Sequence, residues 1–392
     1  MRLSDGSYYF DFASTTPVRD EVIEAMAPYW TELFGNPQSR HHVAGQQAHK
    51  GVEAAREALA GCVSARPEDV IFTGSATEAN NLALMGLADA LKASGRIHII
   101  TTAFEHNCCL QNIARLEAEG FEVTALPLQS DGILCRHRLR DALRADQTGL
   151  VCVMAVNNET GTIQRLEEIG SIIDEVAPDA LFMSDAVQAL GKIPLDMPQQ
   201  RLDLVSLCAH KVYGPKGIGA LIANDRARKM LAPRLHGSGQ EGPGLRSGTL
   251  PPALCVGFGE AARLVIAESE AEQARLGQLR AEFLSVLDNT APGYEVQGAG
   301  TLNIPGTLNL RWPGVEADWL INLTPDLCFS TGAACSGPAK GSHVIRAIRP
   351  ETPEAALQSI RISFGHGTTA ADLTALATRL GEANAAIQAE LV

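Results

Sequence analysis

The sequence predicts an α/β protein whose central sheet is mostly parallel, with helices on both faces, followed by a smaller C-terminal α/β domain. Short continuous apolar runs alternate with helical segments from about residue 70 to residue 223, which is typical of a buried parallel sheet. Several of these runs end beside polar residues and a glycine or proline turn. At 392 residues the chain is also too long for one ordinary core, so a second domain is expected.

The composition indicates an acidic metabolic enzyme. The formal net charge of -13 disfavours nucleic acid or an anionic membrane as a partner, since both select basic surfaces. No run of about 18 apolar residues is present, and the first residues lack the apolar stretch of a secretory signal. The nine cysteines are scattered, without a Cys-x-x-Cys pair or a spacing suited to zinc. We therefore expect reduced thiols, no metal site and a cytoplasmic location.

Two helices are expected before the first strand of the sheet. Residues 18–30 have helical apolar spacing after a proline that can open a helix, and residues 49–63 form a second amphipathic stretch. Between them, a Gly-Asn-Pro turn that contains Asn36 breaks the pattern. This turn is either a plain connection or a border of the active site, and the residues alone do not decide.

The first strand of the sheet, residues 70–73, runs through a turn of small residues into a helix. Free backbone N–H groups at the start of that helix, at Ala76, together with the Thr77 hydroxyl, would make a phosphate site. A bare turn with a helix cap explains this short motif equally well.

Two further strands lead directly into candidate site residues. Residues 97–102 are followed by His106, and residues 150–156, the clearest buried strand, are followed by Asn158. The carboxyl ends of strands are where open α/β sheets bind their ligands. For His106 the alternative is a solvent-facing histidine in a loop.

A lysine and a carboxylate follow two more strands. The run 203–207 changes abruptly into a turn that holds Lys211, and residues 180–183 are followed by Asp185. A lysine that is desolvated at a strand end can react as a neutral amine, although most lysines are solvated and inert. A lysine for the aldehyde and an acid for the ring nitrogen are the pair that pyridoxal phosphate requires.

The remaining segments complete the sheet and lead into the small domain. Residues 218–223 are expected to form the last strand of the sheet, and the glycine-rich segment 236–249 is a loop of a length that is usually functional or disordered. Residues 260–289 form a long alanine-rich helical stretch, which we take as the connection. We place the large domain at residues 15–260 and the small domain at residues 261–392, with residues 1–14 packed nearby.

Two strands of the small domain, at residues 307–311 and 360–364, alternate between apolar and polar residues as half-buried strands do. This alternation places Arg361 on one face of its strand. A surface ion pair is the alternative to a binding role for this arginine.

Together these stretches resemble the class V aminotransferases, and within them the cysteine desulfurases of the iron-sulfur-cluster and nitrogen-fixation type. The resemblance covers nearly the whole chain, from the motif at residues 11–17 to the motif at residues 359–365. It implies the fold type I of pyridoxal phosphate-dependent transferases, with pyridoxal 5'-phosphate bonded to Lys211. It also implies an obligate homodimer.

The resemblance further implies a role for each site residue. Lys211 and His106 would act in catalysis, with the His106 ring stacked on the pyridine, and Asp185 would hold the ring nitrogen. The other implied cofactor contacts are Ala76, Thr77, Asn158, Gln188, Cys208, His210 and, toward the phosphate bound by a second subunit, Thr249. The implied substrate contacts are Asn36, Asn158 and Arg361.

Two departures from the family pattern concern the phosphate site. Gly74 and Ser75 stand in the reverse of the usual Ser-Gly order, so the local turn is expected to differ slightly, because glycine tolerates a positive φ. Cys208 stands where the family usually has a serine, and a thiol is a weaker donor than a hydroxyl. One phosphate contact is therefore expected to be weak or absent.

The implied nucleophile is Cys335, in the segment Ser-Thr-Gly-Ala-Ala-Cys, which resembles the Ser-Gly-Ser-Ala-Cys loop of these desulfurases. A thiol in a loop of small residues is expected to be exposed and reactive, whereas most unpaired cysteines are buried. The implied reaction converts L-cysteine to L-alanine and leaves a persulfide on Cys335 for a protein acceptor.

Two other functions stay open at this point. One is a different class V enzyme, such as a selenocysteine lyase, another lyase or a transaminase. The other is a non-catalytic subunit of a sulfur-relay complex. The acceptor of the sulfur is also open between a cluster scaffold, a tRNA-thiolating enzyme and a DNA-modification system.

Overall fold

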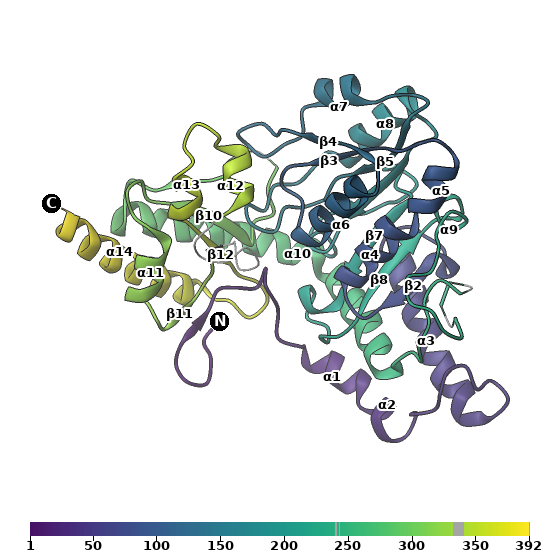
Figure 1. Cartoon of the computed structure of the whole chain (residues 1–392). Coiled ribbons are helices and arrows are strands. Elements are labelled where there is room, and N and C mark those ends of the chain that lie inside the picture. Colours follow the sequence, from purple (N-terminus) through teal and green to yellow (C-terminus); the bar gives the residue numbers. More distant parts are fainter. Residues whose placement is uncertain (240, 243, 301, 332–340, 392) are drawn as a thin grey trace.

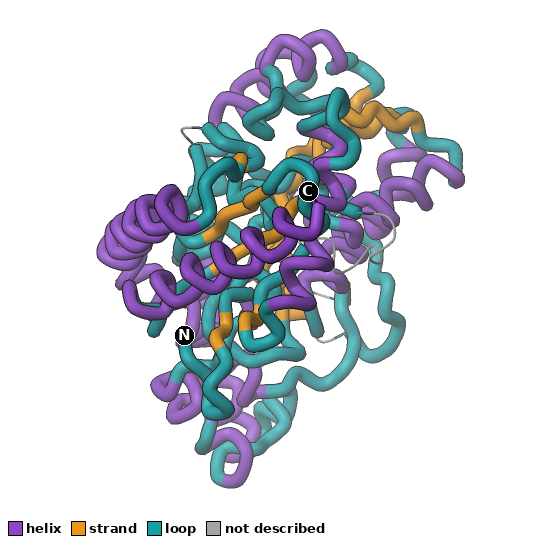
Figure 2. The backbone as a smooth tube through the Cα atoms, turned by 90° about the vertical axis from the view of Figure 1, so that its left-hand side faces the viewer, coloured by secondary structure: helices purple, strands orange, loops and turns teal. Residues whose placement is uncertain are grey.

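A computed structural model describes the whole chain except residues 240, 243, 301, 332–340 and 392. Figure 1 shows a large part built around a central sheet and a smaller part that carries the green and yellow C-terminal segments. Figure 2, turned by 90°, shows the orange strands of the sheet enclosed by helices.

The central sheet has seven strands in the part of the chain that the structure describes, in the order β2-β8-β7-β6-β5-β3-β4. The five strands from β3 to β7 pair in parallel, whereas β8 lies antiparallel between β2 and β7. The mostly parallel sheet is thereby confirmed. The strands are β2 (Val70–Thr73), β3 (His98–Thr102), β4 (Glu122–Leu126), β5 (Thr148–Cys152), β6 (Leu181–Asp185), β7 (Leu204–Cys208) and β8 (Gly219–Ala223).

Both faces of this sheet are covered by helices. Successive side chains of a strand point to opposite faces, so in β6 Leu181 and Phe182 enter two different cores. The Phe182 core is covered by α1 (Asp20–Met26), α3 (Val43–Gly61), α7 (Arg136–Ala142), α8 (Leu166–Val176) and the first half of α10 (Pro252–Thr290). The Leu181 core is covered by α4 (Ala76–Gly86), α5 (Ala88–Ala93), α6 (Asn107–Ala118) and α9 (Asp225–Arg228).

The strand order reverses at β3. From β3 the chain passes through α6 to β4 on one side, and it then crosses back to β5 and continues to β6 and β7 on the other side. Connections that leave neighbouring strands in opposite directions open a crevice at their carboxyl ends. The residues predicted to form the site follow these strands.

The long helix α10 joins the two parts of the molecule. Its first half packs on the sheet through residues such as Phe258, and its second half places Phe283 and Leu287 in a separate core. The helix begins at Pro252, eight residues before the start that the sequence suggested. Pro252 fits this position because the first turn of a helix has no hydrogen-bond acceptor for an N–H group.

The smaller part contains two short sheets and its own core. β12 (Ser359–Ser363) pairs antiparallel with β10 (Thr307–Arg311), which pairs with β9 (Glu295–Val296), and β1 (Tyr8–Tyr9) pairs in parallel with β11 (Leu327–Cys328). The N-terminal Phe10 lies in this core. The described helices here are α11 (Ala317–Leu323), α12 (His343–Ile348), α13 (Ala355–Gln358) and α14 (Ala370–Leu391). The domain boundaries stay a prediction.

The two strands β10 and β12 are fully buried, not half-buried as their alternation suggested. Leu308, Leu310 and Ile362 do face the apolar core on one side, as expected. The polar side, however, faces the large part of the molecule, where Arg361 contacts Asp11 and Asn158. The alternation correctly identified the two faces but not what covers the second one.

Other boundaries differ because of local constraints. Two helices replace the single helix expected at residues 18–30. α1 ends at Met26, and α2 (Pro28–Thr31) begins at a proline. α3 begins at Val43, earlier than expected. β5 ends at Cys152, yet Val153 and Ala155 still donate backbone hydrogen bonds to the end of β6. Residues 153–156 are thus buried, as predicted, without forming a regular ladder.

Candidate active site

A cavity of about 390 Å³ opens at the carboxyl ends of β3, β5, β6 and β7. Its wall brings together most of the residues that the sequence predicted, although they come from segments far apart in the chain. They are Ala76, Thr77, His106, Asn158, Asp185, Gln188, Cys208, His210, Lys211 and Arg361.

Lys211 lies in a single 3-10 turn, Ala209–Lys211, directly after β7. Its Nζ donates hydrogen bonds to the backbone oxygens of Ala13 (2.7 Å) and Ser14 (2.5 Å). Burial lowers the pKa of this amine, because the charged form loses its hydration. The side chain is therefore held in the cavity wall with an increased fraction of neutral amine.

Asp185 ends β6 on the strand next to β7. Its carboxylate accepts hydrogen bonds from Asn80 Nδ2 (3.0 Å) and from the Val187 N–H (3.1 Å), and in the described part of the chain no ion pair involves it. Burial raises the pKa of this carboxyl group to about 6. A cationic group in the cavity would supply the positive charge that the buried carboxylate lacks.

His106 caps the N-terminus of α6. Its Nδ1 accepts from the Cys108 N–H at 3.2 Å and lies 3.0 Å from Cys108 Sγ. Hydrogen bonding from Cys109 and His106 lowers the pKa of the Cys108 thiol. Cys108 lines the cavity but was not predicted, although its place two residues after His106 at the start of a helix was a signal for it.

The start of α4 forms one end of the cavity. The Ser75 hydroxyl caps this helix by accepting from the Glu78 N–H at 3.1 Å, and Ala76 and Thr77 form its first turn. Neither Gly74 nor Ser75 has a positive φ, so the reversed Gly-Ser order does not alter the turn in the way we expected. The free N–H groups of a helix start suit an anion.

Two more predicted residues, Cys208 and His210, lie next to Lys211 in the chain and line the cavity. Cys208 is almost fully buried, and burial raises the pKa of its thiol to about 12, so that it stays neutral. The His210 ring lies 3.2 Å from the Thr15 hydroxyl, and burial, aided by Lys211, lowers its pKa to about 4. Both side chains therefore face the cavity uncharged at neutral pH.

Arg361 approaches the cavity from β12. Its Nη2 donates to Asp11 Oδ1 (2.7 Å) and to the Ser14 hydroxyl (2.6 Å), and its Nη1 donates to the Asn158 backbone oxygen (2.9 Å). Its Nε has no hydrogen-bond partner among the described residues. The guanidinium is thus buried and oriented by an internal ion pair, which the sequence had offered only as a surface alternative.

Three predicted residues are not in the cavity wall. Asn36 and Thr249 are exposed and do not line it. Cys335 lies outside the described residues, so its predicted role is not tested. Asn80 and Lys192 belong to the site's surroundings and were missed. Asn80 lies on α4 four residues after Ala76, which is the spacing of neighbours on a helical turn, whereas Lys192 lies in a turn that no sequence pattern marked.

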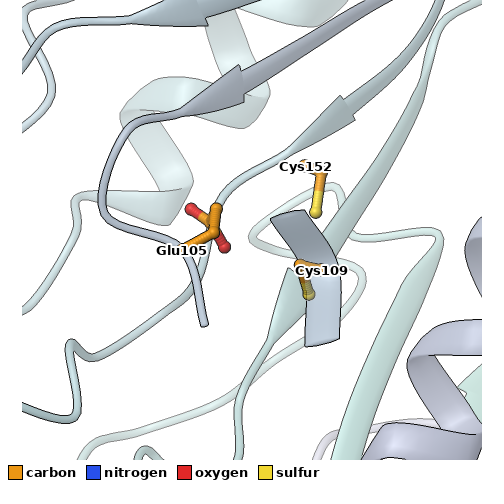
Figure 3. Close-up of side chains that lie close together, drawn as sticks. All are labelled: Glu105, Cys109 and Cys152. Carbon is orange, nitrogen blue, oxygen red and sulfur yellow. The ribbon is translucent and has the colours of Figure 1, made fainter. Parts of the chain in front are cut away.

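Behind the cavity, Glu105, Cys109 and Cys152 gather in the core (Figure 3) with one potential ligand atom each within 4.8 Å of the others. Burial raises the pKa of Glu105 to about 8, and hydrogen bonds with Cys108 and Cys152 raise that of Cys109 well above its usual value. Protonated thiols and carboxyl groups do not ligate cations. We regard this cluster as a neutral polar part of the core.

Comparison with known proteins identifies close relatives of the chain. The family model described as aminotransferase class-V matches residues 8–376. The chain is 40% identical over 375 residues to the mitosomal cysteine desulfurase of Trachipleistophora hominis, which covers 94% of this chain and 84% of that protein. It is 43% identical over 362 residues to the cysteine desulfurase IscS of Neisseria meningitidis serogroup C, which covers 92% of this chain and 88% of the relative.

Solved structures agree with these matches. A NifS-like protein superimposes with a TM-score of 0.88 at 32% identity and covers 96% of this chain and 98% of its own. A structure titled SspA in complex with cysteine superimposes with a TM-score of 0.79 at 36% identity. The match covers 92% of this chain and 99% of the other. Within the described residues, no helix has the length and apolar character needed to span a membrane.

Proposed function

This chain belongs to the class V aminotransferase family, and from that premise we infer that it is a pyridoxal phosphate-dependent cysteine desulfurase. The reaction converts L-cysteine and an enzyme thiol to L-alanine and an enzyme persulfide, so one C–S bond breaks and one S–S bond forms. The observation that carries this function is the placement of Lys211 and Asp185 at the ends of two adjacent strands in one cavity.

The donor set of the cavity fits pyridoxal phosphate. Asp185 is a buried carboxylate without an ion-pair partner in the described part of the chain, and a protonated ring nitrogen would pair with it. The start of α4 offers N–H groups to the phosphate, and Gln188 and His106 flank the space between. When bound, the cofactor supplies an aldehyde for Lys211 and a ring that withdraws electrons from the substrate Cα.

Three residues of the chain have separate roles in the proposed reaction. Lys211 Nζ takes the proton from the substrate Cα, a role that its lowered pKa supports. Arg361 orients the substrate carboxylate, and its guanidinium is already held in place by Asp11. Cys335, as a thiolate, attacks the substrate sulfur and keeps it as a persulfide, which we take from the family resemblance of its segment.

The decisive experiment measures alanine and sulfide from L-cysteine with purified protein, a reductant and added pyridoxal phosphate. Parent protein should form both products, and reductive trapping followed by peptide mapping should mark Lys211. Cys335→Ala should bind the cofactor as the parent does but form almost no alanine, since no thiolate remains to accept the sulfur. Undiminished alanine formation by Cys335→Ala would contradict the proposed mechanism.

We further propose a homodimer in which Asn36 and Thr249 act across the interface. Support comes from their exposure in one chain and from four exposed large apolar side chains among the first 43 residues, Ile23, Trp30, Phe34 and Val43. Burying exposed large apolar side chains on association would favour a dimer. A protein sulfur acceptor and a cytoplasmic location are also proposed, the latter because the eight described cysteines are free thiols.

A further inference from the structure

Lys192 is a second lysine next to the cavity that the proposed reaction does not use. It lies in the turn after β6, four residues beyond Gln188, and lines a small cavity whose wall also contains Lys211 and Ala13. Burial and the nearby Lys211 lower its pKa to about 7. Such a side chain is costly to bury, which raises the question of what it does there.

The Lys192 side chain contacts one end of the Gln188 amide. Its Nζ donates to Gln188 Oε1 at 2.9 Å, and Gln188 Nε2 donates to the Ala13 backbone oxygen at 2.8 Å. The Ala13 carbonyl oxygen can only accept, so the NH₂ group of Gln188 faces it, and the Lys192 amine donates to the amide oxygen on the other side. The two contacts therefore select the same orientation of the amide, with Oε1 toward Lys192 and the NH₂ group toward Ala13.

This orientation matters because Gln188 is also part of the cavity wall. The NH₂ group has two N–H bonds, and Ala13 uses one of them. The other remains to donate to an acceptor in the cavity. With the amide reversed, the carbonyl oxygen would face that acceptor and the two would repel each other.

The backbone conformation at Gly191 brings Lys192 toward Gln188. Gly191 has φ +70°, a left-handed conformation that favours glycine, and an added Cβ would lie 2.6 Å from Val265 Cγ2. The turn can therefore pass under α10 and bring Lys192 back toward Gln188 only with a glycine at this position.

We propose that Lys192 is a positioning residue, which holds the Gln188 amide with its NH₂ group toward the cavity, where it donates to the ring hydroxyl oxygen of pyridoxal phosphate. This inference rests on the proposed function, since that function supplies the ligand. Lys192 itself does not touch the cofactor, so its effect passes through Gln188.

The test is a double-mutant cycle on the dissociation constant of pyridoxal phosphate from the apo form of the full-length protein, with the absorption maximum of the bound cofactor as a second measurement. Lys192→Met should weaken binding by roughly three- to tenfold, the worth of a typical hydrogen bond to a charged or polar group, and should shift the absorption maximum. Lys192→Arg keeps a donor on a side chain of similar length, so its dissociation constant and absorption maximum should both be close to those of the parent. In a Gln188→Ala background, Lys192→Met should have no further effect.

The exposed Lys229 provides a matched control, because Lys229→Met removes a lysine far from the cavity wall and should leave both measurements unchanged. Equal losses from Lys192→Met in the parent and in the Gln188→Ala background would overturn the inference, and so would unchanged binding. If Lys192→Met does not fold, Lys192→Gln, whose side chain is shorter but polar, enters the same cycle, and any loss of binding that it causes should disappear in the Gln188→Ala background. A parent protein that binds no pyridoxal phosphate would instead contradict the proposed function.

Discussion

Arg361 illustrates how single residues of this site are prepared before any ligand binds. Asp11, Ser14 and the Asn158 backbone together accept from both Nη atoms, so the guanidinium has little freedom left to lose when a carboxylate arrives. Holding a group in its productive position in advance lowers the entropic cost of binding and reaction. The N-terminal segment therefore contributes to the site through Asp11 and Ser14, far from it in sequence.

At Cys208, replacing the thiol with a hydroxyl should tighten cofactor binding. The thiol is neutral, buried and a weak donor at the cavity wall, whereas a serine would donate a stronger hydrogen bond to a phosphate. Cys208→Ser should lower the dissociation constant of pyridoxal phosphate about fivefold, which corresponds to about 1 kcal/mol. Titration of the apo protein with pyridoxal phosphate, followed by absorbance, measures this dissociation constant. Cys62→Ser, away from the site, is the control. Weaker binding by Cys208→Ser would show that the thiol has another purpose.

The pH dependence of cofactor attachment should reflect the lowered pKa of Lys211. A neutral amine is needed for the attack on the aldehyde, and burial makes the Lys211 amine neutral at lower pH than an exposed lysine, whose pKa is about 10.4. At saturating pyridoxal phosphate, the rate of covalent attachment should rise with pH to a plateau whose midpoint lies below that value. Stopped-flow absorbance in the Lys192→Met background removes the titration of the neighbouring lysine. A midpoint at or above the ordinary lysine value would contradict the assignment.

At the scale of elements, a buried ion pair attaches the glycine-rich loop to the sheet. Glu241 accepts from both Nη atoms of Arg56 on α3 at 2.8 Å and from the Phe72 N–H on β2 at 3.0 Å. The loop is thus fixed to two elements through one carboxylate that is only 2% exposed.

Removing the arginine of this pair should destabilise the protein strongly. Arg56→Met leaves the Glu241 carboxylate buried without its partner, which costs about 3–5 kcal/mol in the free energy of unfolding. The thermal midpoint, followed by circular dichroism, should fall clearly. Arg140→Met, which breaks the exposed pair with Glu175, is the matched control and should change it little. Similar midpoints for the two variants would mean that this contact does not hold the loop.

In the whole molecule, the exposed apolar side chains of the N-terminal segment, residues 23–43, should lie in the dimer interface. Trp30, at 61% exposure, is the largest of them, and a charge in its place would be buried on association. Trp30→Glu should shift the protein toward the monomer in sedimentation velocity measurements. Trp319→Glu alters another exposed tryptophan, at 38%, on α11 and should leave the dimer intact. A dimer that survives Trp30→Glu unchanged would place the interface elsewhere.

The parallel sheet and the residues at its strand ends could be predicted from local sequence patterns. Buried parallel strands are short apolar runs, and the residue that follows each run lies at the shared carboxyl edge, so His106, Asn158, Asp185 and Lys211 could be predicted to lie together. These features depend on local pattern and on the regular geometry of the sheet. The boundaries of α3, β5 and α10 could not be predicted closely, because their ends depend on contacts with other elements.

Which polar groups contact one another could not be predicted, because it depends on how distant segments pack. Arg361 and Asp11 are 350 residues apart, and their ion pair exists because β12 and the N-terminal segment lie side by side over the cavity. Likewise, the Gln188 amide is oriented by Ala13 from the other end of the chain and by Lys192 after a tight glycine turn. Hydrogen bonds depend on distances of a few tenths of an ångström between atoms that local sequence patterns do not relate, so these partners appear only when the chain is folded.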